Sequence, residues 1–261
     1  MDSLLWFVVT LVLLVVVVRL IHRHMHGMAY LLTGSEEMAL VLYALPLLPG
    51  VVLHEFSHML MAILLRVRTG GFTVLPRRDA SGHVTLGSVV VEKVDVVRAS
   101  LVGIAPLLFG VVAVLLIGQR VFGVDDLGRV VSSGDNSAIL DTFAALFQTP
   151  DAWLWLYLIF AVSNAMLPSP SDRETWLPVI LFIVGVVALA VVADRGDILQ
   201  ALAGPIRAGV TWLTAAFLFT LAVDGPVLAL IWLLERGAGR LIGRRVEYSA
   251  PVAKHVKRKT R

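Results

Sequence analysis

Long apolar runs constrain this chain more than any other feature of its sequence. A helix needs about 20 apolar residues to cross a bilayer, and six runs approach or exceed that length. The chain is 58% hydrophobic and 16% charged, whereas charged residues make up about a quarter of a soluble domain. The sequence therefore predicts an all-α polytopic membrane protein with about six transmembrane helices. The predicted spans are residues 4–21, 38–65, 99–118, 152–168, 177–193 and 210–234.

The distribution of positive charge predicts how these spans are oriented. Six spans place both termini on one side of the membrane, and Lys and Arg favour the cytoplasmic side. With cytoplasmic termini, 16 of the 22 Lys and Arg residues fall on that side. We therefore expect a multi-pass protein of a prokaryotic cell membrane with both termini cytoplasmic. Because topology explains the basic residues, we do not expect nucleic-acid binding.

The second apolar run carries the pattern H-E-x-x-H at His54, Glu55 and His58. Positions i and i+4 share one face of a helix, so both imidazoles can hold one divalent metal ion, with Glu55 beside it as a base that activates water. Ionisable groups at membrane depth are costly and therefore indicate function. The chain has no cysteine, which leaves His, carboxylate and water as metal ligands. The run predicts a zinc hydrolase within the bilayer.

A hydrolytic zinc site uses three protein ligands and one open position, so one more ligand is required. Two carboxylates are candidates. Asp172 follows Pro168 and Pro170, which predict a break in a helix, and Asp224 stands in an Asp-Gly-Pro sequence within the last span. For Asp224 we favour a helix break at which the carboxylate meets a cavity or a polar group of a neighbouring helix.

A β-hairpin is predicted directly after the metal-binding helix, within residues 71–95. Two β-branched runs flank a polar turn that contains glycine, a pattern typical of a hairpin. An open hairpin edge cannot face lipid, because its amide groups would lack partners. The hairpin is therefore expected at the interface or beside a cavity. His83, near the turn, is interpreted as a surface residue rather than a metal ligand.

The other connections carry weaker signals. Residues 22–37 are interpreted as a short polar link whose histidines either feed metal or lie at the membrane interface, and we favour the interface. Loop 119–151 is acidic, and the tail after Glu235 is basic, as in segments that contact anionic lipid. The histidines of the link are His22, His24 and His26, and the acidic residues of the loop are Asp125, Asp126, Asp135, Asp141 and Asp151.

Taken together, these motifs resemble the site-2 protease family of intramembrane zinc metalloproteases. The resemblance covers about residues 45–175 and combines H-E-x-x-H in a membrane helix, a β-segment after it, Gly103-Ile-Ala-Pro106 in the next span, and an Asn/Pro/Asp loop. It implies that His54, His58 and Asp172 bind Zn²⁺. It further implies that Glu55 activates water and that Asn164 helps to bind substrate.

The chain departs from the family pattern around Asp172. In the family, the aspartate belongs to the motif Asn-x-x-Pro-x-x-x-Leu-Asp-Gly. Here the first proline falls one place late, Ser171 replaces the leucine and Arg173 replaces the glycine. Neither a PDZ-like nor a CBS-like domain is recognisable. The predicted organisation is an N-terminal anchor and link (1–37), a metalloprotease core (38–175), two additional transmembrane helices (176–234) and a basic cytoplasmic tail (235–261).

The predicted function is cleavage of peptide bonds in or near transmembrane segments of membrane-protein or peptide substrates. A transmembrane substrate would unwind locally and could join the hairpin as an added strand. Two alternatives stay open. One is a metal-binding membrane scaffold without proteolytic activity. The other is a small ion transporter that uses Asp224, His54 and Glu55, although the sequence shows none of the internal repeats typical of transporters.

Overall fold

The computed structural model describes residues 2–78, 84–122, 141, 148–174, 176–192, 196–243 and 246. His83, three acidic residues of loop 119–151 (Asp125, Asp126 and Asp135) and most of the basic tail lie outside the described residues. The helices are α1 (Asp2–Thr33), α2 (Glu36–Ala44), the 3-10 turn η1 (Leu45–Leu47), α3 (Leu48–Leu64), α4 (Val96–Arg120), α7 (Ala152–Ala165), α8 (Trp176–Val192) and α9 (Gly196–Ile242). The strands are β1 (Thr69–Thr73), β2 (Arg77–Arg78), β3 (Val84–Thr85) and β4 (Ser88–Val91).

Four of the described helical segments are long and apolar enough to cross a membrane: α1, the unit Glu36–Leu64 formed by α2, η1 and α3, α4, and most of α9. Helices α7 and α8 are also apolar, but they have 14 and 17 residues, at or below the lower end of the usual span length. The predominantly helical fold is confirmed, and the four long apolar helices are consistent with a membrane protein. Six spans are not confirmed. The span predicted at 152–168 ends at Ala165, ahead of Pro168 and Pro170.

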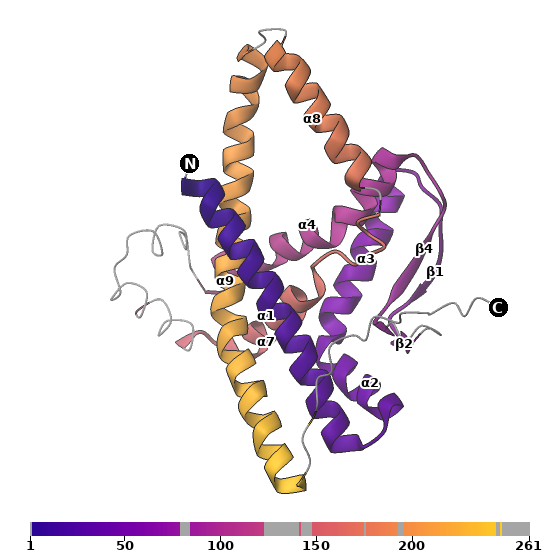
Figure 1. Cartoon of the computed structure of the whole chain (residues 1–261), viewed down its shortest axis with the longest axis vertical. Helices are drawn as coiled ribbons and strands as arrows, with labels where there is room; N and C mark the ends of the chain where they lie inside the picture. Colours follow the sequence, from indigo (N-terminus) through magenta and orange to yellow (C-terminus); the bar gives the residue numbers. More distant parts are fainter. Residues whose placement is uncertain are drawn as a thin grey trace, which may run out of the picture.

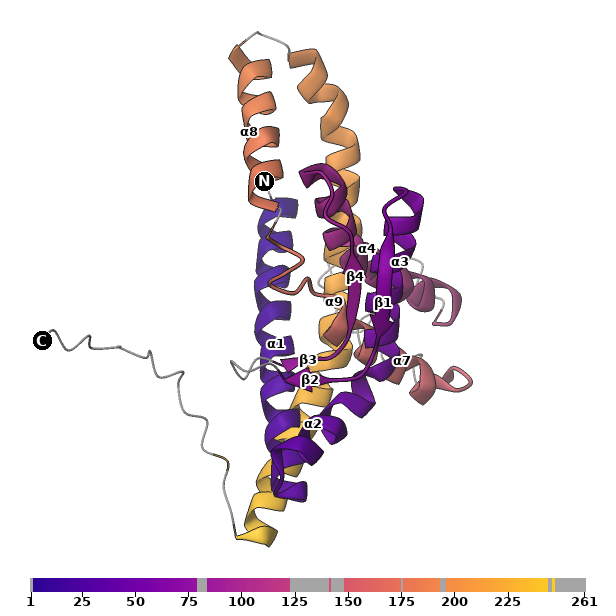
Figure 2. The same cartoon turned by 90° about the vertical axis from the view of Figure 1, so that its right-hand side faces the viewer.

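Helices α1 and α9 lie side by side and run in the same direction (Figures 1 and 2). Phe7 stacks on Phe217 near one end of the pair, and His24 pairs with Glu235 near the other. In a chain of six alternating spans, the first and last would run in opposite directions. If α1 and α9 each cross the membrane, the start of α1 and the end of α9 lie on opposite sides of it. Two cytoplasmic termini do not fit this arrangement.

The predicted polar link at 22–37 is wrong for most of its length, because α1 continues to Thr33. The physical reason is a helical pattern that the histidines obscure. Ile21, Met25 and Ala29 recur at a spacing of four residues and are buried, so this part of α1 has an apolar face that packs on its neighbours. Only Gly34, with a φ of 65°, and Ser35 separate α1 from α2.

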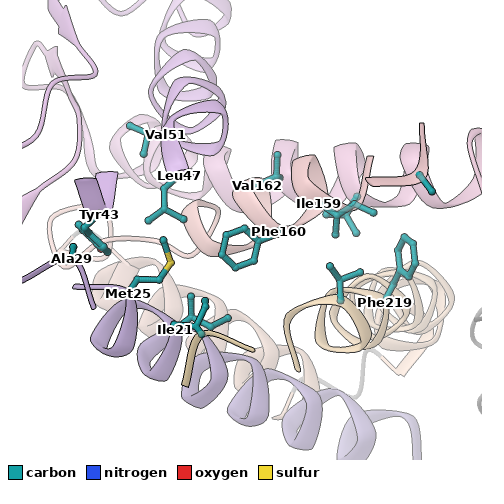
Figure 3. Close-up of a cluster of buried hydrophobic side chains, with 14 of the residues drawn as sticks. Ile21, Met25, Ala29, Tyr43, Leu47, Val51, Ile159, Phe160, Val162 and Phe219 are labelled. Carbon is teal, nitrogen blue, oxygen red and sulfur yellow. The ribbon is translucent and has the colours of Figure 1, made fainter. Parts of the chain in front are cut away.

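The main hydrophobic core lies where α1, α2, η1, α3, α7 and α9 meet (Figure 3). Its buried side chains come from segments far apart in the sequence, so the core fixes the start of α3 against the end of α7. The labelled members are Ile21, Met25, Ala29, Tyr43, Leu47, Val51, Ile159, Phe160, Val162 and Phe219.

Helix α3 ends in a turn that sends the chain back along the helix. Arg66 takes a left-handed conformation with a φ of 56°, and the Val67 amide donates to the Ala62 carbonyl at 2.8 Å, as in a Schellman motif. Strand β1 follows and pairs antiparallel with β4, with Phe72 opposite Val89. A second short antiparallel pair joins β2 and β3. The predicted β-hairpin after the metal-binding helix is confirmed (Figure 2).

Candidate metal centre

Three predicted metal ligands lie together in the structure. His54 and His58 stand one turn apart on α3, and their Nε2 atoms are 3.1 Å apart. Asp172 comes from the loop between α7 and α8. Its Oδ2 lies 3.6 Å from Nε2 of His54, and its Oδ1 lies 3.3 Å from Nε2 of His58. The fold therefore brings together residues separated by more than a hundred positions.

Backbone carbonyls determine which nitrogen of each imidazole carries the proton. Nδ1 of His54 lies 2.6 Å from the carbonyl oxygen of Ala165, and Nδ1 of His58 lies 2.8 Å from that of Val102. A carbonyl only accepts hydrogen bonds, so each Nδ1 is the donor and each neutral ring presents a lone pair at Nε2. Two lone pairs and a carboxylate thus converge on one point. With both rings neutral, three acceptors face one another, an arrangement that a bound cation or a proton added to one imidazole relieves.

The spacing of these atoms fits a metal ion. A tetrahedral ion with bonds of about 2.0–2.1 Å to N and O places its ligand atoms about 3.3 Å apart. The Nε2 atoms of His54 and His58 are 3.1 Å apart, and they lie 3.6 and 3.3 Å from different oxygens of Asp172. With one ligand atom taken from each residue, all three atoms lie within 4.8 Å of one another. The three residues form a group that can hold a metal ion. Carbonyl oxygens behind metal-bound imidazoles are a common device for fixing ring orientation.

The loop that carries Asp172 is shaped by its prolines, as predicted. Helix α7 ends at Ala165 and α8 begins at Trp176. The Ser169 amide donates to Oδ2 of Asp172 at 2.7 Å. Burial raises the pKa of the Asp172 carboxyl, but hydrogen bonds with His54, His58 and Ser169 outweigh burial and hold that pKa below its usual value. The group is therefore an anion at neutral pH.

Two residues that depart from the family pattern flank Asp172 in the loop, and one of them, Ser171, lines the adjoining cavity. Ser171 and Arg173 are exposed, and the Arg173 guanidinium donates to the Ser169 carbonyl within the same loop. On the inner side, Gly103 of α4 backs the loop. A Cβ atom there would lie 2.3 Å from the Asp172 carbonyl oxygen, so only glycine lets α4 approach the loop this closely. Gly103 therefore serves the packing of α4 against the loop.

Glu55 lies beside the three ligands at the wall of a cavity of about 1230 Å³, which His54, His58 and Asp172 also line. The Glu55 side chain is 6% exposed. Gly87, just before β4, packs against it, since a Cβ atom at Gly87 would lie 2.8 Å from both Cγ and Oε1 of Glu55. The carboxylate is thereby held between the metal-ligand group and the β-segment, where it can exchange protons with water in the cavity.

Asn164 lines the same cavity, and its side chain is almost fully buried. Its Nδ2 donates to the Phe160 carbonyl at 2.9 Å and approaches Asp224 at 3.3 Å. Its Oδ1 has no hydrogen-bond partner among the described residues. This oxygen is itself buried, and substrate binding by Asn164 stays a prediction.

Asp224 is not part of the metal-ligand group. Its carboxylate, which is 0% exposed, contacts the Ser163 hydroxyl at 3.0 and 3.1 Å. This confirms the predicted contact with a polar group of a neighbouring helix. The predicted helix break is wrong, because α9 continues through Pro226. A proline removes one donor from a helix, and a helix packed among others tolerates this loss.

Sequence reasoning missed the groups that orient the ligands. Val102 and Ala165 act through backbone carbonyls, so their side chains give no signal. Gly87 lies in a β-branched run, and nothing in that run marks it as the neighbour of Glu55. His22 and Tyr43 also line the cavity, although His22 was interpreted as an interface residue.

No protein-family model, curated protein or solved structure matches this chain. What the site does is therefore inferred from its own residues.

Proposed function

We propose that this protein is an intramembrane zinc metalloprotease, a divergent member of the site-2 protease family, that cleaves peptide bonds in or near transmembrane segments. One observation carries the proposal: in a membrane-length apolar helix, two imidazole lone pairs and a carboxylate converge beside Glu55 at a cavity. Costly polar groups at this depth are retained where they serve a function. The prokaryotic cell membrane stays a prediction.

Zinc suits this donor set. Two imidazoles and one carboxylate are the ligands of several zinc hydrolases, with the fourth position open. The chain has no thiolate to offer. His54, His58 and Asp172 would hold the zinc ion, which would supply Lewis acidity for polarising a scissile carbonyl and activating water.

The protein's own residues perform the proton transfers. Glu55 takes a proton from the attacking water and delivers it to the amine that leaves, as a general base and then a general acid. Its position between Gly87 and His54 keeps the carboxylate at the cavity rather than in lipid. The backbone carbonyls of Ala165 and Val102 keep both imidazoles turned toward the centre.

Strand β4 supplies a place for an unwound substrate. Among the described residues its strand partner is β1, on one edge, and Ser88, Val89 and Val91 of β4 line the cavity. A substrate segment that adds as a strand along the free edge would have its backbone amides paired and its peptide bonds exposed near Glu55. This explains how a transmembrane helix could be opened for hydrolysis.

The test is cleavage of a membrane-protein substrate by purified, zinc-loaded protein in lipid nanodiscs. Candidate substrates come from comparing membrane-protein fragments in cells that carry the wild type or Glu55→Gln. We expect Glu55→Gln to keep its zinc and lose cleavage by more than about 100-fold, within the usual contribution of a general base. Glu37→Gln, at the exposed start of α2, is the matched control and should cleave normally.

Two outcomes would contradict the proposal, the first its mechanism and the second the proteolysis itself. Unchanged cleavage in Glu55→Gln would refute the assigned role of Glu55. A wild-type protein that binds zinc, yet whose presence changes no membrane-protein fragment, would favour the metal-binding scaffold.

A further inference from the structure

The C-terminal end of α7 is bound by imidazoles from two other helices. The last carbonyls of a helix have no partner within it, and the prolines after α7 prevent the helix from continuing. The Asn164 carbonyl lies 3.0 Å from Nε2 of His22 on α1. The next carbonyl, that of Ala165, lies 2.6 Å from Nδ1 of His54 on α3. Two consecutive carbonyls are therefore each satisfied by a histidine.

His22 is itself fixed by a second contact. Because the Asn164 carbonyl only accepts, the His22 proton lies on Nε2, and Nδ1 is an acceptor. The Tyr43 hydroxyl of α2 lies 2.5 Å from this Nδ1 and donates to it. Tyr43 is 9% exposed and belongs to the main core. The chain from Tyr43 through His22 to Asn164 thus links the core to the last turn of α7.

We propose that His22 and Tyr43 are positioning residues for the metal centre. They hold the Asn164 carbonyl, which fixes the last turn of α7, and this turn presents the Ala165 carbonyl that orients His54. The inference rests on the metal-binding part of the proposed function and not on proteolysis. It assigns a role in metal binding to α1 and α2, which lie mostly outside the segment that resembles the protease family.

The position of His54 explains why this support matters. An imidazole rotates about two side-chain bonds, and its Nε2 stays directed at the centre only while Nδ1 keeps its partner. If the last turn of α7 moves by a fraction of an ångström, the Ala165 carbonyl moves with it. The ring of His54 then loses its fixed orientation, whereas His58, which uses the Val102 carbonyl of α4, keeps its own.

The test measures zinc affinity in nanodiscs by competition with a chromophoric chelator. His22→Leu removes both hydrogen bonds and should weaken zinc binding about tenfold, the lower end of the effect of losing an outer hydrogen bond at a metal site. His22→Gln keeps a donor for the Asn164 carbonyl and should restore most of the affinity. Tyr43→Phe should weaken binding in the same direction, by less.

His24→Leu is the matched control. His24 lies on α1, two residues from His22, and pairs with Glu235 of α9. The substitution removes this pair, which does not involve α7. Zinc affinity should stay at the wild-type value. The visible spectrum of the cobalt-substituted protein gives a second measurement: His22→Leu should change the d–d bands of the ion, and His24→Leu should leave them unchanged.

The outcomes separate this inference from the proposed function. Wild-type affinity and cobalt spectrum in His22→Leu would overturn the positioning role. A His22→Gln variant as weak as His22→Leu would also overturn it, because the hydrogen bond would not be what matters. If His22→Leu does not fold, His22→Gln and Tyr43→Phe decide. Failure to cleave any substrate, with these affinity changes intact, would reject the protease and leave the positioning role standing.

Discussion

At the scale of single residues, two glycines determine how closely other elements approach the site. Gly87 brings the β-segment against the Glu55 side chain, and Gly103 brings α4 against the loop of Asp172. Gly87 neighbours the proposed base, and Gly103 neighbours a proposed metal ligand. Substituting the first should therefore affect cleavage, and substituting the second should affect metal binding.

Gly87→Ala should reduce cleavage and leave zinc binding intact. The added Cβ would lie 2.8 Å from Cγ of Glu55, so the carboxylate must move, and a small misplacement of a reacting group can cost about 100-fold in rate. Gly71→Ala, in β1 with open space around it, is the control and should cleave normally. A Gly87→Ala variant with full activity would show that the position of Glu55 does not limit the reaction.

Gly103→Ala should instead weaken zinc binding. Its Cβ would lie 2.3 Å from the Asp172 carbonyl oxygen, and the loop must shift to relieve an overpacking strain of about 1–3 kcal/mol. Gly185→Ala, in α8 with open space around it, separates this strain from the general gain of about 0.5–1 kcal/mol when a helical glycine becomes alanine. Equal zinc affinity in both variants, measured by chelator competition, would contradict the close approach of α4 to the loop of Asp172.

At the scale of elements, the pairing of α7 with α9 depends on a buried carboxylate. Asp224 contacts Ser163 and Asn164, and removing it takes one hydrogen-bond partner from each in an apolar interior, where the Phe160 carbonyl remains as their shared acceptor. Asp224→Ala should therefore lower the free energy of unfolding by about 1–3 kcal/mol while the protein, at saturating zinc, still binds one ion. Asp224→Asn, which keeps an acceptor, should lower it less.

Loss of the bound ion in Asp224→Ala, with Asp172→Ala still binding zinc, would make Asp224 the third ligand. Thermal unfolding in nanodiscs and zinc content provide the two measurements.

The sequence predicted the elements that carry strong local patterns. The spacing of His54 and His58 predicted a metal-binding helix face, Pro168 and Pro170 predicted the loop of Asp172, and the β-branched runs predicted the hairpin. It failed where tertiary packing outweighs local signals. Met25 and Ala29 pack against the core and keep α1 helical past its histidines. Helix α9, which packs mainly on α1, continues through Pro226, whose side chain is exposed.

At the scale of the whole molecule, the parallel arrangement of α1 and α9 would place the start of α1 and the end of α9 on opposite sides of a membrane that both helices cross. It could not be predicted from apolar runs, because counting each run as one span assumes that α7 and α8 both cross. Helices α7 and α8 have only 14 and 17 residues, and the loop that carries Asp172 separates them.

The sidedness can be measured with single cysteines, since the natural chain has none. Ser3→Cys lies near the start of α1, and Leu241→Cys, at a position 91% exposed, lies near the end of α9. A maleimide that cannot cross membranes should label the two from opposite sides of oriented vesicles. Labelling of both from one side would support the six alternating spans expected from the charge distribution.

The central claim is that His54 and His58 of α3 and Asp172 of the loop between α7 and α8 hold a metal ion. It is tested most directly by zinc K-edge X-ray absorption on the purified, zinc-loaded protein after removal of free metal. We predict one tightly held zinc with only N and O neighbours at about 2.0–2.1 Å and outer scattering from two imidazoles. No retained zinc, or a spectrum without two imidazoles, would contradict the assignment of His54, His58 and Asp172 as a metal centre.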